Sequence, residues 1–274
     1  MKNYLFAKFF QHLSVEELMT TCCELGLDGP TAMIRDGYWI RPEAVAEDLP
    51  AYVKAAREAG LEVVYADTPF DMDKLPNMDR ELNALAENGV QLFRVNYIAK
   101  SVVPARQLAD HFARLTEMTA TAAEKHGLRA VVQLHGHFYP HNATAAYAGI
   151  KNLDPRYIGI KMDPGNNLTQ EGYELFPYQV ELLDEYIAAL GQKDGAVHRY
   201  KEDADQSKGW VPHFEPAQSG MANYDELYAA FKKHDIHVPG ILMPFYHEND
   251  YEKLLSAFKD EIAYFKHCQE KAGL

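Results

Sequence analysis

The sequence predicts a single (β/α)8 barrel of the TIM type, and three observations support this fold class. Short apolar runs alternate with amphipathic helical segments along the whole chain of 274 residues, and parallel strands need such helical crossovers. About eight strand–helix units can be distinguished, and the chain length matches the roughly 250 residues of one such barrel. No Gly-x-Gly-x-x-Gly motif follows the first expected strand, which argues against the doubly wound open sheet.

The elements are expected in strict alternation within one domain, residues 1–274. The expected strands are residues 4–10, 29–34, 61–67, 91–97, 130–135, 158–163, 196–201 and 240–245. The expected helices are those that open at Ser14 and at Pro42, followed by residues 77–88, 104–126, 142–151, 176–190, 224–234 and 250–272. Ser14 and Glu17 form a capping box at the start of the first helix, and Gly26 is a typical stop signal at its end.

Composition and charge restrict the class of partner. The chain is 47% hydrophobic and 24% charged, as expected for one globular domain. Its formal net charge of −13 argues against nucleic acid or an anionic membrane as partner, since both require a basic surface. Three cysteines without metal-like spacing, and no secretory signal or apolar spanning segment, indicate a cytoplasmic protein. The long final helix would permit a homodimer.

Polar residues at the ends of two neighbouring strands indicate a site. Asp163 ends an apolar strand and is followed by a Pro-Gly turn, and in barrels of this type the carboxyl edge of the strands carries the chemistry. Gln133, His135 and His137 occupy alternate positions at the end of the preceding strand, so they can point to one side. Simpler roles are a turn cap for Asp163 and hydrogen bonds to loop backbone for the others.

The expected seventh strand, residues 196–201, ends in Lys201, a candidate for holding a substrate oxyanion or for acting as a base. Its simpler role is a surface salt bridge. His198 would face one side of this strand and Arg199 the other, and the sequence leaves open which side lines the barrel, because a slip of one residue exchanges the faces.

Further candidates would bind the substrate. Arg94 and Asn96 share one side of the fourth expected strand, and Arg94 is suited to a carboxylate or phosphate. An arginine that only ties strands together is the alternative. Phe9 and Trp39 are aromatic faces against which a sugar ring could stack, although aromatic residues more often belong to the core.

Several segments, taken in order, make the chain similar to the xylose isomerase-like barrels. This family includes sugar-phosphate isomerases, sugar epimerases, hydroxypyruvate isomerases, inosose dehydratases and endonuclease IV. The segments that carry the resemblance are residues 27–31, 35–43, 59–64, 153–165 and 219–224. The resemblance implies a (β/α)8 barrel that acts on a small sugar or polyol.

The resemblance also implies one divalent cation, such as Mn²⁺, Mg²⁺ or Zn²⁺, held by Glu, Asp, His and Glu from the fifth to the eighth strand. Here Gln133 stands at the first of these positions, Asp163 is retained, and the histidine falls on His198 or, in another register, on Arg199. The last position falls near Met243 or Phe245, with Glu248 as an alternative. A neutral Gln133 cannot act as a base and is a weaker ligand for a hard cation than a carboxylate.

These observations predict an isomerase or epimerase that transfers a proton next to a carbonyl group and has a degenerate metal site. His135, Lys201 and Asp163 are the catalytic candidates, and Gln133, Asp163 and His198 are the metal candidates. Arg94, Asn96, His137, Phe9, Trp39 and Arg199 are the candidates for substrate binding. The alternatives are a metal-free lyase or dehydratase for keto-sugars, and a carbohydrate-binding barrel without catalysis.

Overall fold

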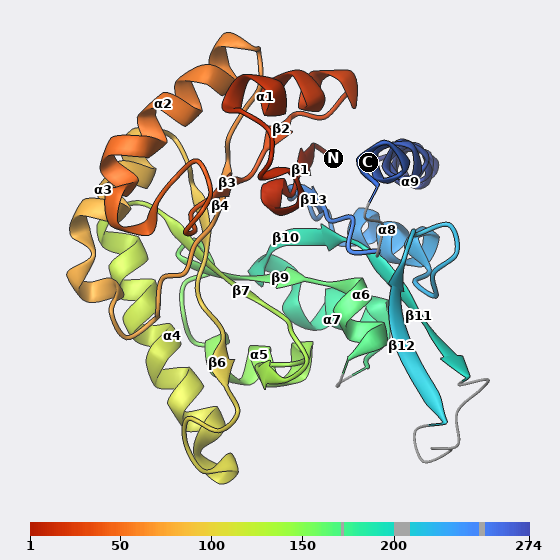
Figure 1. Cartoon of the computed structure of the whole chain (residues 1–274). Coiled ribbons are helices and arrows are strands. Elements are labelled where there is room, and N and C mark those ends of the chain that lie inside the picture. Colours follow the sequence, from red (N-terminus) through yellow and green to blue (C-terminus); the bar gives the residue numbers. More distant parts are fainter. Residues whose placement is uncertain (171–172, 200–208, 247–249) are drawn as a thin grey trace.

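The computed structural model describes residues 1–170, 173–199, 209–246 and 250–274, and its centre is a closed parallel barrel surrounded by helices (Figure 1). In order around the barrel the strands are β2 (Gly29–Pro30), β1 (Asn3–Leu5), β13 (Gly240–Leu242), β10 (Ile187–Gln192), β9 (Ile158–Met162), β7 (Arg129–Gln133), β5 (Leu92–Arg94), β4 (Tyr65–Asp67) and β3 (Ala32–Met33). All of their pairings are parallel.

The barrel closes at Thr31, which alone separates β2 from β3. The β2 half pairs with β1, and the β3 half pairs with β4. The Thr31 amide continues the ladder by donating a hydrogen bond to the Leu5 carbonyl at 2.8 Å. β2 and β3 are therefore two halves of one strand, which makes eight strands in all and confirms the predicted (β/α)8 fold.

The helices in the described part of the chain follow the strands and cover the outside of the barrel (Figure 1). They are α1 (Val15–Glu24), α2 (Val45–Glu58), α3 (Asp79–Glu87), α4 (Leu108–Lys125), α5 (Ala143–Ile150), α6 (Pro164–Thr169), α7 (Phe176–Leu183), α8 (Tyr224–Lys233) and α9 (Tyr251–Ala272). No helix in the described residues combines the length and apolar character that a membrane span requires.

The predicted signals at the ends of α1 are confirmed. The Ser14 hydroxyl accepts a hydrogen bond from the Glu17 amide, and the Glu17 carboxylate accepts one from the Ser14 amide. These two bonds satisfy amides that a helix start leaves without a partner. Gly26 follows the helix with a φ of 62°, a left-handed conformation that suits glycine.

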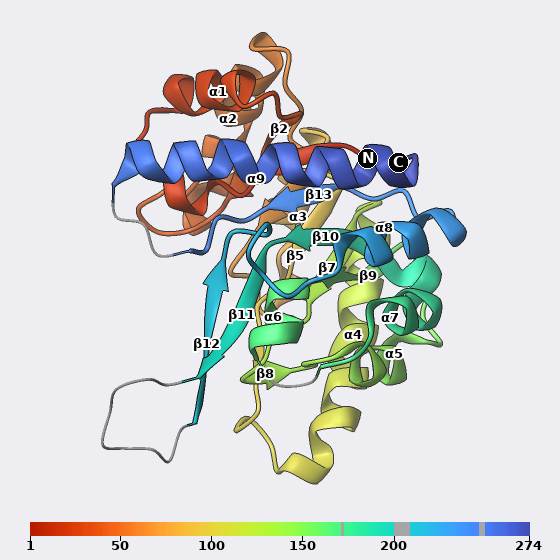
Figure 2. The same cartoon turned by 90° about the vertical axis from the view of Figure 1, so that its right-hand side faces the viewer.

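The seventh strand was predicted at the wrong place. Residues 176–190 were expected to form one helix, but α7 ends at Leu183, and residues 187–192 form β10, which lies between β9 and β13 in the barrel. The expected strand at residues 196–201 belongs instead to β11 (Asp194–Arg199), which pairs antiparallel with β12 (Trp210–Glu215). This hairpin extends beyond the barrel in both views (Figures 1 and 2).

A second small addition narrows the carboxyl edge of the barrel. β6 (Ile98–Ala99) and β8 (Phe138–Tyr139) pair antiparallel in the loops that follow β5 and β7. The pairing holds these two loops together beside the strand ends that carry Arg94 and Gln133. The candidate site lies at this carboxyl edge.

Candidate functional site

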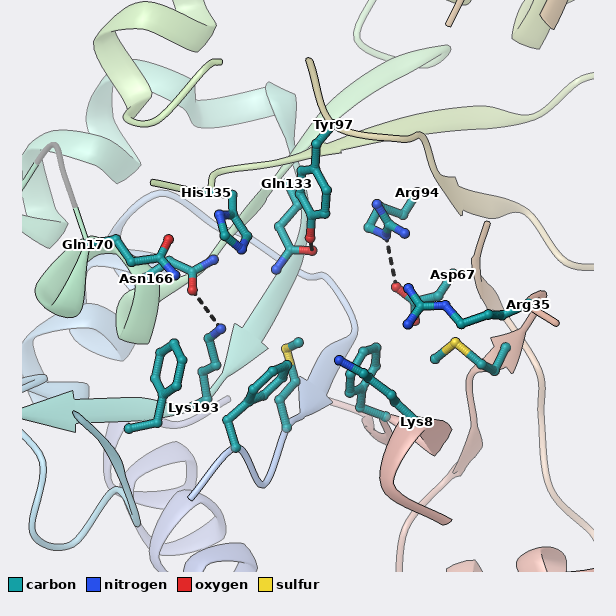
Figure 3. Close-up of a pocket in the computed structure, with 15 residues that line it drawn as sticks. Lys8, Arg35, Asp67, Arg94, Tyr97, Gln133, His135, Asn166, Gln170 and Lys193 are labelled. Atoms are coloured by element: carbon teal, nitrogen blue, oxygen red, sulfur yellow. Dashed lines mark hydrogen bonds and ion pairs between the residues drawn. The ribbon is translucent and has the colours of Figure 1, made fainter. Parts of the chain in front are cut away.

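A cavity of about 160 Å³ lies at the carboxyl ends of the barrel strands (Figure 3). Every barrel strand contributes to its lining, directly or through the segment that follows the strand. The lining residues are Phe6, Lys8, Met33, Arg35, Asp67, Arg94, Tyr97, Gln133, His135, Asn166, Gln170, Lys193, Phe214, Met243 and Phe245. This is a volume for a small molecule, not for a polymer.

Asp163 contacts the cavity-lining residues Gln133 and Asn166 and is fixed by the start of α6. Its side chain caps that helix by accepting a hydrogen bond from the Asn166 amide at 3.0 Å. The Asn166 side-chain amide donates a second bond at 3.0 Å, and the Gln133 amide a third at 2.6 Å. Asp163 is 1% exposed, so its oxygen atoms are held by short polar contacts and are almost shielded from solvent.

Gln133 is held at both ends of its side chain. Its nitrogen donates to Asp163, and its oxygen accepts a hydrogen bond from the Tyr97 hydroxyl at 2.8 Å. Burial raises the pKa of Tyr97 to about 12, so this hydroxyl keeps its proton. The order Tyr97–Gln133–Asp163 therefore fixes which end of the amide is the donor.

Lys193 is the first residue after β10 and brings a cation to Asp163. Its Nζ atom lies 2.7 Å from Asn166 Oδ1 and 3.4 Å from Asp163 Oδ2. The rings of Phe214 and Phe245 face the ammonium at 4.4 and 4.3 Å from their centroids. Burial lowers the pKa of Lys193 to about 8, and the charge of Asp163 opposes this shift.

His135 stands beside this group at the mouth of the cavity. It is half-buried and lies edge-on to Tyr97, with ring centroids 4.8 Å apart. Burial lowers the pKa of His135 below its ordinary value of 6.5, so the ring is neutral at pH 7 and can accept a proton. Neutral histidine and charged lysine are thus found on one side of the same cavity (Figure 3).

The residues do not fit a divalent metal at the expected place. Gln133 and Asp163 are close together, but the position that faces them on β10 is Gly191, where a Cβ atom would lie 3.4 Å from Asp163 Oδ2 and 3.1 Å from Met243 Sδ. Met243 offers a soft thioether, which Mg²⁺ and Mn²⁺ avoid. Among the described residues no three His, Cys, Asp or Glu side chains are placed to share a metal ion. The Lys193 ammonium already lies 3.4 Å from Asp163 Oδ2, so a cation on that oxygen atom would have a like charge beside it.

Several predicted site residues are not brought to the cavity. His198 and Arg199 are exposed on β11, where His198 pairs with Glu215. The predicted metal set of Gln133, Asp163 and His198 is therefore wrong as a group, because residue 198 lies on the hairpin and not on a barrel strand. Lys201 and Glu248 lie outside the described residues.

The predicted substrate-binding residues divide in the same way. Arg94 lines the cavity. Asn96 turns away and donates a hydrogen bond to Asp71 at 2.8 Å, and His137 is exposed. Phe9 packs against the cavity residue Phe245 at 4.9 Å between centroids without lining the cavity itself, and Trp39 donates its indole N–H to the Leu13 carbonyl at 2.9 Å.

The sequence reasoning missed Lys193, although a signal for it exists. Lys193-Asp194-Gly195 follows an apolar run, as Asp163-Pro164-Gly165 follows β9, and both mark a strand that ends in polar residues before a turn. Lys8, Arg35 and Asp67 were also missed, because each stands alone after its strand and no spacing links them.

The structure resembles solved barrels over nearly its whole length. D-psicose 3-epimerase from Clostridium cellulolyticum H10, solved with D-tagatose, is 12% identical with a TM-score of 0.73, and the match covers 98% of this chain and 99% of that one. A xylose isomerase-like TIM barrel protein from Mycobacterium smegmatis, in complex with magnesium, is 15% identical with a TM-score of 0.71, covering 99% and 97%. The probable 3-DHS dehydratase AsbF from Bacillus anthracis is 15% identical with a TM-score of 0.71, covering 97% and 99%.

The chain has the xylose isomerase-like TIM barrel fold, which confirms the resemblance at the level of the fold. No model of a known protein family and no curated protein matches the sequence. At 12–15% identity the likeness establishes the architecture, and the chemistry has to be argued from the residues of the cavity.

Proposed function

We propose that this protein is an enzyme that moves a proton next to the carbonyl group of a small keto-sugar or keto-polyol, as an isomerase, epimerase or lyase. The observation that carries the proposal is the buried pair of Lys193 and Asp163 beside the neutral His135. Barrels of this fold include an epimerase solved with a ketose and a dehydratase, which supports the substrate class.

The charge that develops in such a reaction falls on the carbonyl oxygen. When a base removes the proton from the adjacent carbon, the C–H bond breaks and its electron pair forms a carbon–carbon double bond, which pushes the carbonyl electrons onto oxygen. The Lys193 ammonium would donate a hydrogen bond to that oxygen and stabilise the enolate. A fixed cation in a site closed to water is effective in this role, because no reorganisation is needed during the reaction.

His135 is the base in this proposal, since it is neutral and lines the same cavity. Asp163 positions the ammonium and keeps it charged, and Gln133 and Asn166 in turn position Asp163. Return of a proton to the same carbon on its opposite face gives an epimer. Return of the proton to the former carbonyl carbon, while the proton of the neighbouring hydroxyl group passes to the enolate oxygen, gives an isomer. Departure of a β-hydroxyl group from the enolate gives a dehydration. All three outcomes begin with the same proton transfer.

Exchange of that proton with solvent tests the proposal without knowledge of the final product. A panel of ketotetroses, ketopentoses, ketohexoses and keto-inositols is incubated with the protein in D₂O containing EDTA, and ¹H NMR follows the signal next to each carbonyl. We expect deuterium to enter at least one compound, and Lys193→Met to slow the exchange by about 100-fold or more.

Lys54→Met is the matched control, because Lys54 is an exposed lysine on α2, and it should keep the parent rate. Equal exchange in Lys193→Met would remove Lys193 from the mechanism. A compound that raises the melting temperature but shows neither exchange nor conversion would instead identify a carbohydrate-binding barrel. Gln133 and Met243, at or near positions where the resemblance implies glutamate ligands, would explain that outcome.

A further inference from the structure

The side of the cavity opposite Lys193 is rich in positive charge. Lys8 follows β1, Arg35 follows β3 and Arg94 ends β5, and the three surround the carboxylate of Asp67 (Figure 3). Three cations and one carboxylate leave two formal positive charges in this corner, although the whole chain has a net charge of −13. We call Lys8, Arg35, Arg94 and Asp67 the cationic corner.

The Arg94 side chain already forms an ion pair and hydrogen bonds within the protein. Its Nε atom lies 3.2 Å from Asp67 Oδ1, and its terminal nitrogen atoms donate hydrogen bonds to the carbonyl groups of Val95 at 2.9 Å and Thr68 at 3.0 Å. Arg94 is 5% exposed. It therefore sets the position and the field of the corner and has few donors left for a ligand.

Lys8 and Arg35 differ from Arg94 in their contacts. Neither forms an ion pair or a side-chain hydrogen bond with another residue of the described part of the chain. Lys8 Nζ lies 5.2 Å from the centroid of the Phe245 ring, and its side chain is half-buried. Burial lowers the pKa of Lys8, and the like charges of Arg35 and Arg94 lower it further, whereas the charge of Asp67 opposes the shift. A bound anion would relieve this repulsion.

The carboxylate of Asp67 is a second indication that this corner of the cavity binds a ligand. Its residue is 3% exposed, and its Oδ2 atom has no hydrogen-bond partner among the described residues. A buried carboxylate oxygen without a donor is unfavourable. A hydroxyl group of a ligand in the cavity would supply the missing donor.

We propose that the cationic corner binds a terminal anionic group of the substrate, a carboxylate or a phosphate ester, with a neighbouring hydroxyl donating to Asp67. The Arg35 guanidinium has the planar fork that grips two oxygen atoms of such a group, and Lys8 adds a point charge. This deepens the proposed function and rests on it: the substrate would lie across the cavity with its anionic end at Arg35 and its carbonyl at Lys193.

Binding of matched four-carbon compounds tests the proposal without turnover. Erythritol, erythronate and erythritol 4-phosphate share a carbon skeleton and differ in charge, and calorimetry gives their dissociation constants at 50 and 200 mM KCl. We expect at least one anion to bind tenfold or more tightly than erythritol, and its advantage to shrink at the higher salt concentration. A preference for erythronate indicates a carboxylate subsite, and a preference for the phosphate indicates a phosphate-ester subsite.

Variants assign the binding to the corner. Lys8→Met and Arg35→Gln should each reduce anion affinity by about tenfold and leave erythritol unchanged, whereas Lys54→Met should bind all three compounds as the parent does. The proposal is overturned if neither anion binds more tightly than erythritol, or if the Lys8→Met/Arg35→Gln double variant keeps the preference. Proton exchange in the ketose panel is a separate readout, so the subsite can fail while the proposed chemistry stands, and the reverse.

Discussion

The surroundings of Lys193 act on the charge of its ammonium group in two opposite directions. Two phenyl rings and the wall of the cavity remove water, which disfavours the charge, while Asp163 and the Asn166 oxygen atom favour it. The result is a pKa of about 8, more than two units below that of an exposed lysine. A small rise in pH therefore changes the charge of this residue.

The pH dependence of turnover should reflect the lowered pKa of Lys193. Since the proposed role requires the protonated amine, kcat/KM should fall as pH rises through about 8, the pKa of Lys193. It should also fall below pH 6.5 as His135, whose pKa is lowered by burial, gains a proton. In Lys193→Arg, which keeps its charge, the fall near pH 8 should disappear even if the rate is lower. A fall that survives in this variant would place the group elsewhere.

Lys161 is a second buried lysine, and its amine has no hydrogen-bond partner in the described structure. It lies between the rings of Phe6 and Tyr65, 5.5 and 5.3 Å from their centroids. Burial lowers its pKa, so the charged form destabilises the fold. The absence of a side chain at Gly191, whose Cβ would lie 3.1 Å from Lys161 Cε, leaves the room that this lysine occupies.

Replacing Lys161 by methionine should stabilise the protein. The substitution keeps the length and removes the buried amine, a type of change that contributes about 1–4 kcal/mol in other proteins. The gain should be largest below the lowered pKa of Lys161 and shrink as pH rises towards 10, because the folded parent releases its proton before the unfolded chain does. Urea unfolding at several pH values measures this, and a gain that does not depend on pH would rule out the charge as its cause.

At the scale of elements, the β11–β12 hairpin connects the site to the outer surface. Phe214 of β12 covers Lys193, and Asp194, the first residue of β11, accepts hydrogen bonds from the amides of Gly195, Met221 and Ala222. These bonds join the start of the hairpin to the segment before α8. Gly220 lies against this carboxylate, where a Cβ atom would come within 2.1 Å of the Asp194 carboxyl carbon.

Gly220→Ala should therefore destabilise the protein by about 1–3 kcal/mol, as overpacking against a fixed group does. Gln218→Ala, at an exposed position of the same segment, is the control and should unfold as the parent does. Thermal unfolding compares the three proteins. Equal melting temperatures would show that Asp194 can move without loss and does not hold the hairpin in place.

The barrel strand that precedes this hairpin was not predicted from the sequence. Residues 187–192, Ile-Ala-Ala-Leu-Gly-Gln, are as compatible with the end of a helix as with a buried strand, because a strand of a parallel barrel is apolar on both faces and has no alternation. Residues 196–199, Ala-Val-His-Arg, pass from apolar to polar side chains, as the end of a barrel strand is expected to do. Residues 196–201 were therefore predicted as the seventh barrel strand, and Lys193 was not recognised as a residue at a strand end.

The other strand ends were predictable for a physical reason. Asp163, Gln133 and His135 follow apolar runs of unambiguous length, and the carboxyl edge of a parallel barrel brings such residues together whatever the exact register. The hydrogen bonds among them, and the meeting of Lys8, Arg35 and Asp67 from three separate strands, depend on side-chain directions that one sequence does not contain.

At the scale of the whole molecule, the closed barrel places fixed positive charges inside a protein of net charge −13. Lys161 lies on β9, and Lys193 directly follows β10. Lys193, 3.4 Å from Asp163, would compete with any added cation for this carboxylate.

Metal should consequently have little effect on this protein. Dialysis against EDTA and later addition of 1 mM Mn²⁺, Mg²⁺ or Zn²⁺ should leave the melting temperature unchanged within about 1 °C, since a ligand that binds the native state would raise it. Proton exchange in the ketose panel should be equally insensitive. A metal-dependent rise that is lost in Asp163→Ala would establish a metal site at these strand ends and contradict the present proposal.

The lysine after β10 also has a consequence for how the protein becomes active in a cell. A metal-dependent enzyme leaves the ribosome without its electrophile and has to acquire it from a pool that competes, fluctuates and offers the wrong ions. Here the positive charge would be encoded in the chain and present as soon as the barrel closes. The protein would then depend on pH and not on a supply of metal, because an ammonium group, unlike a divalent ion, loses its charge when it loses its proton.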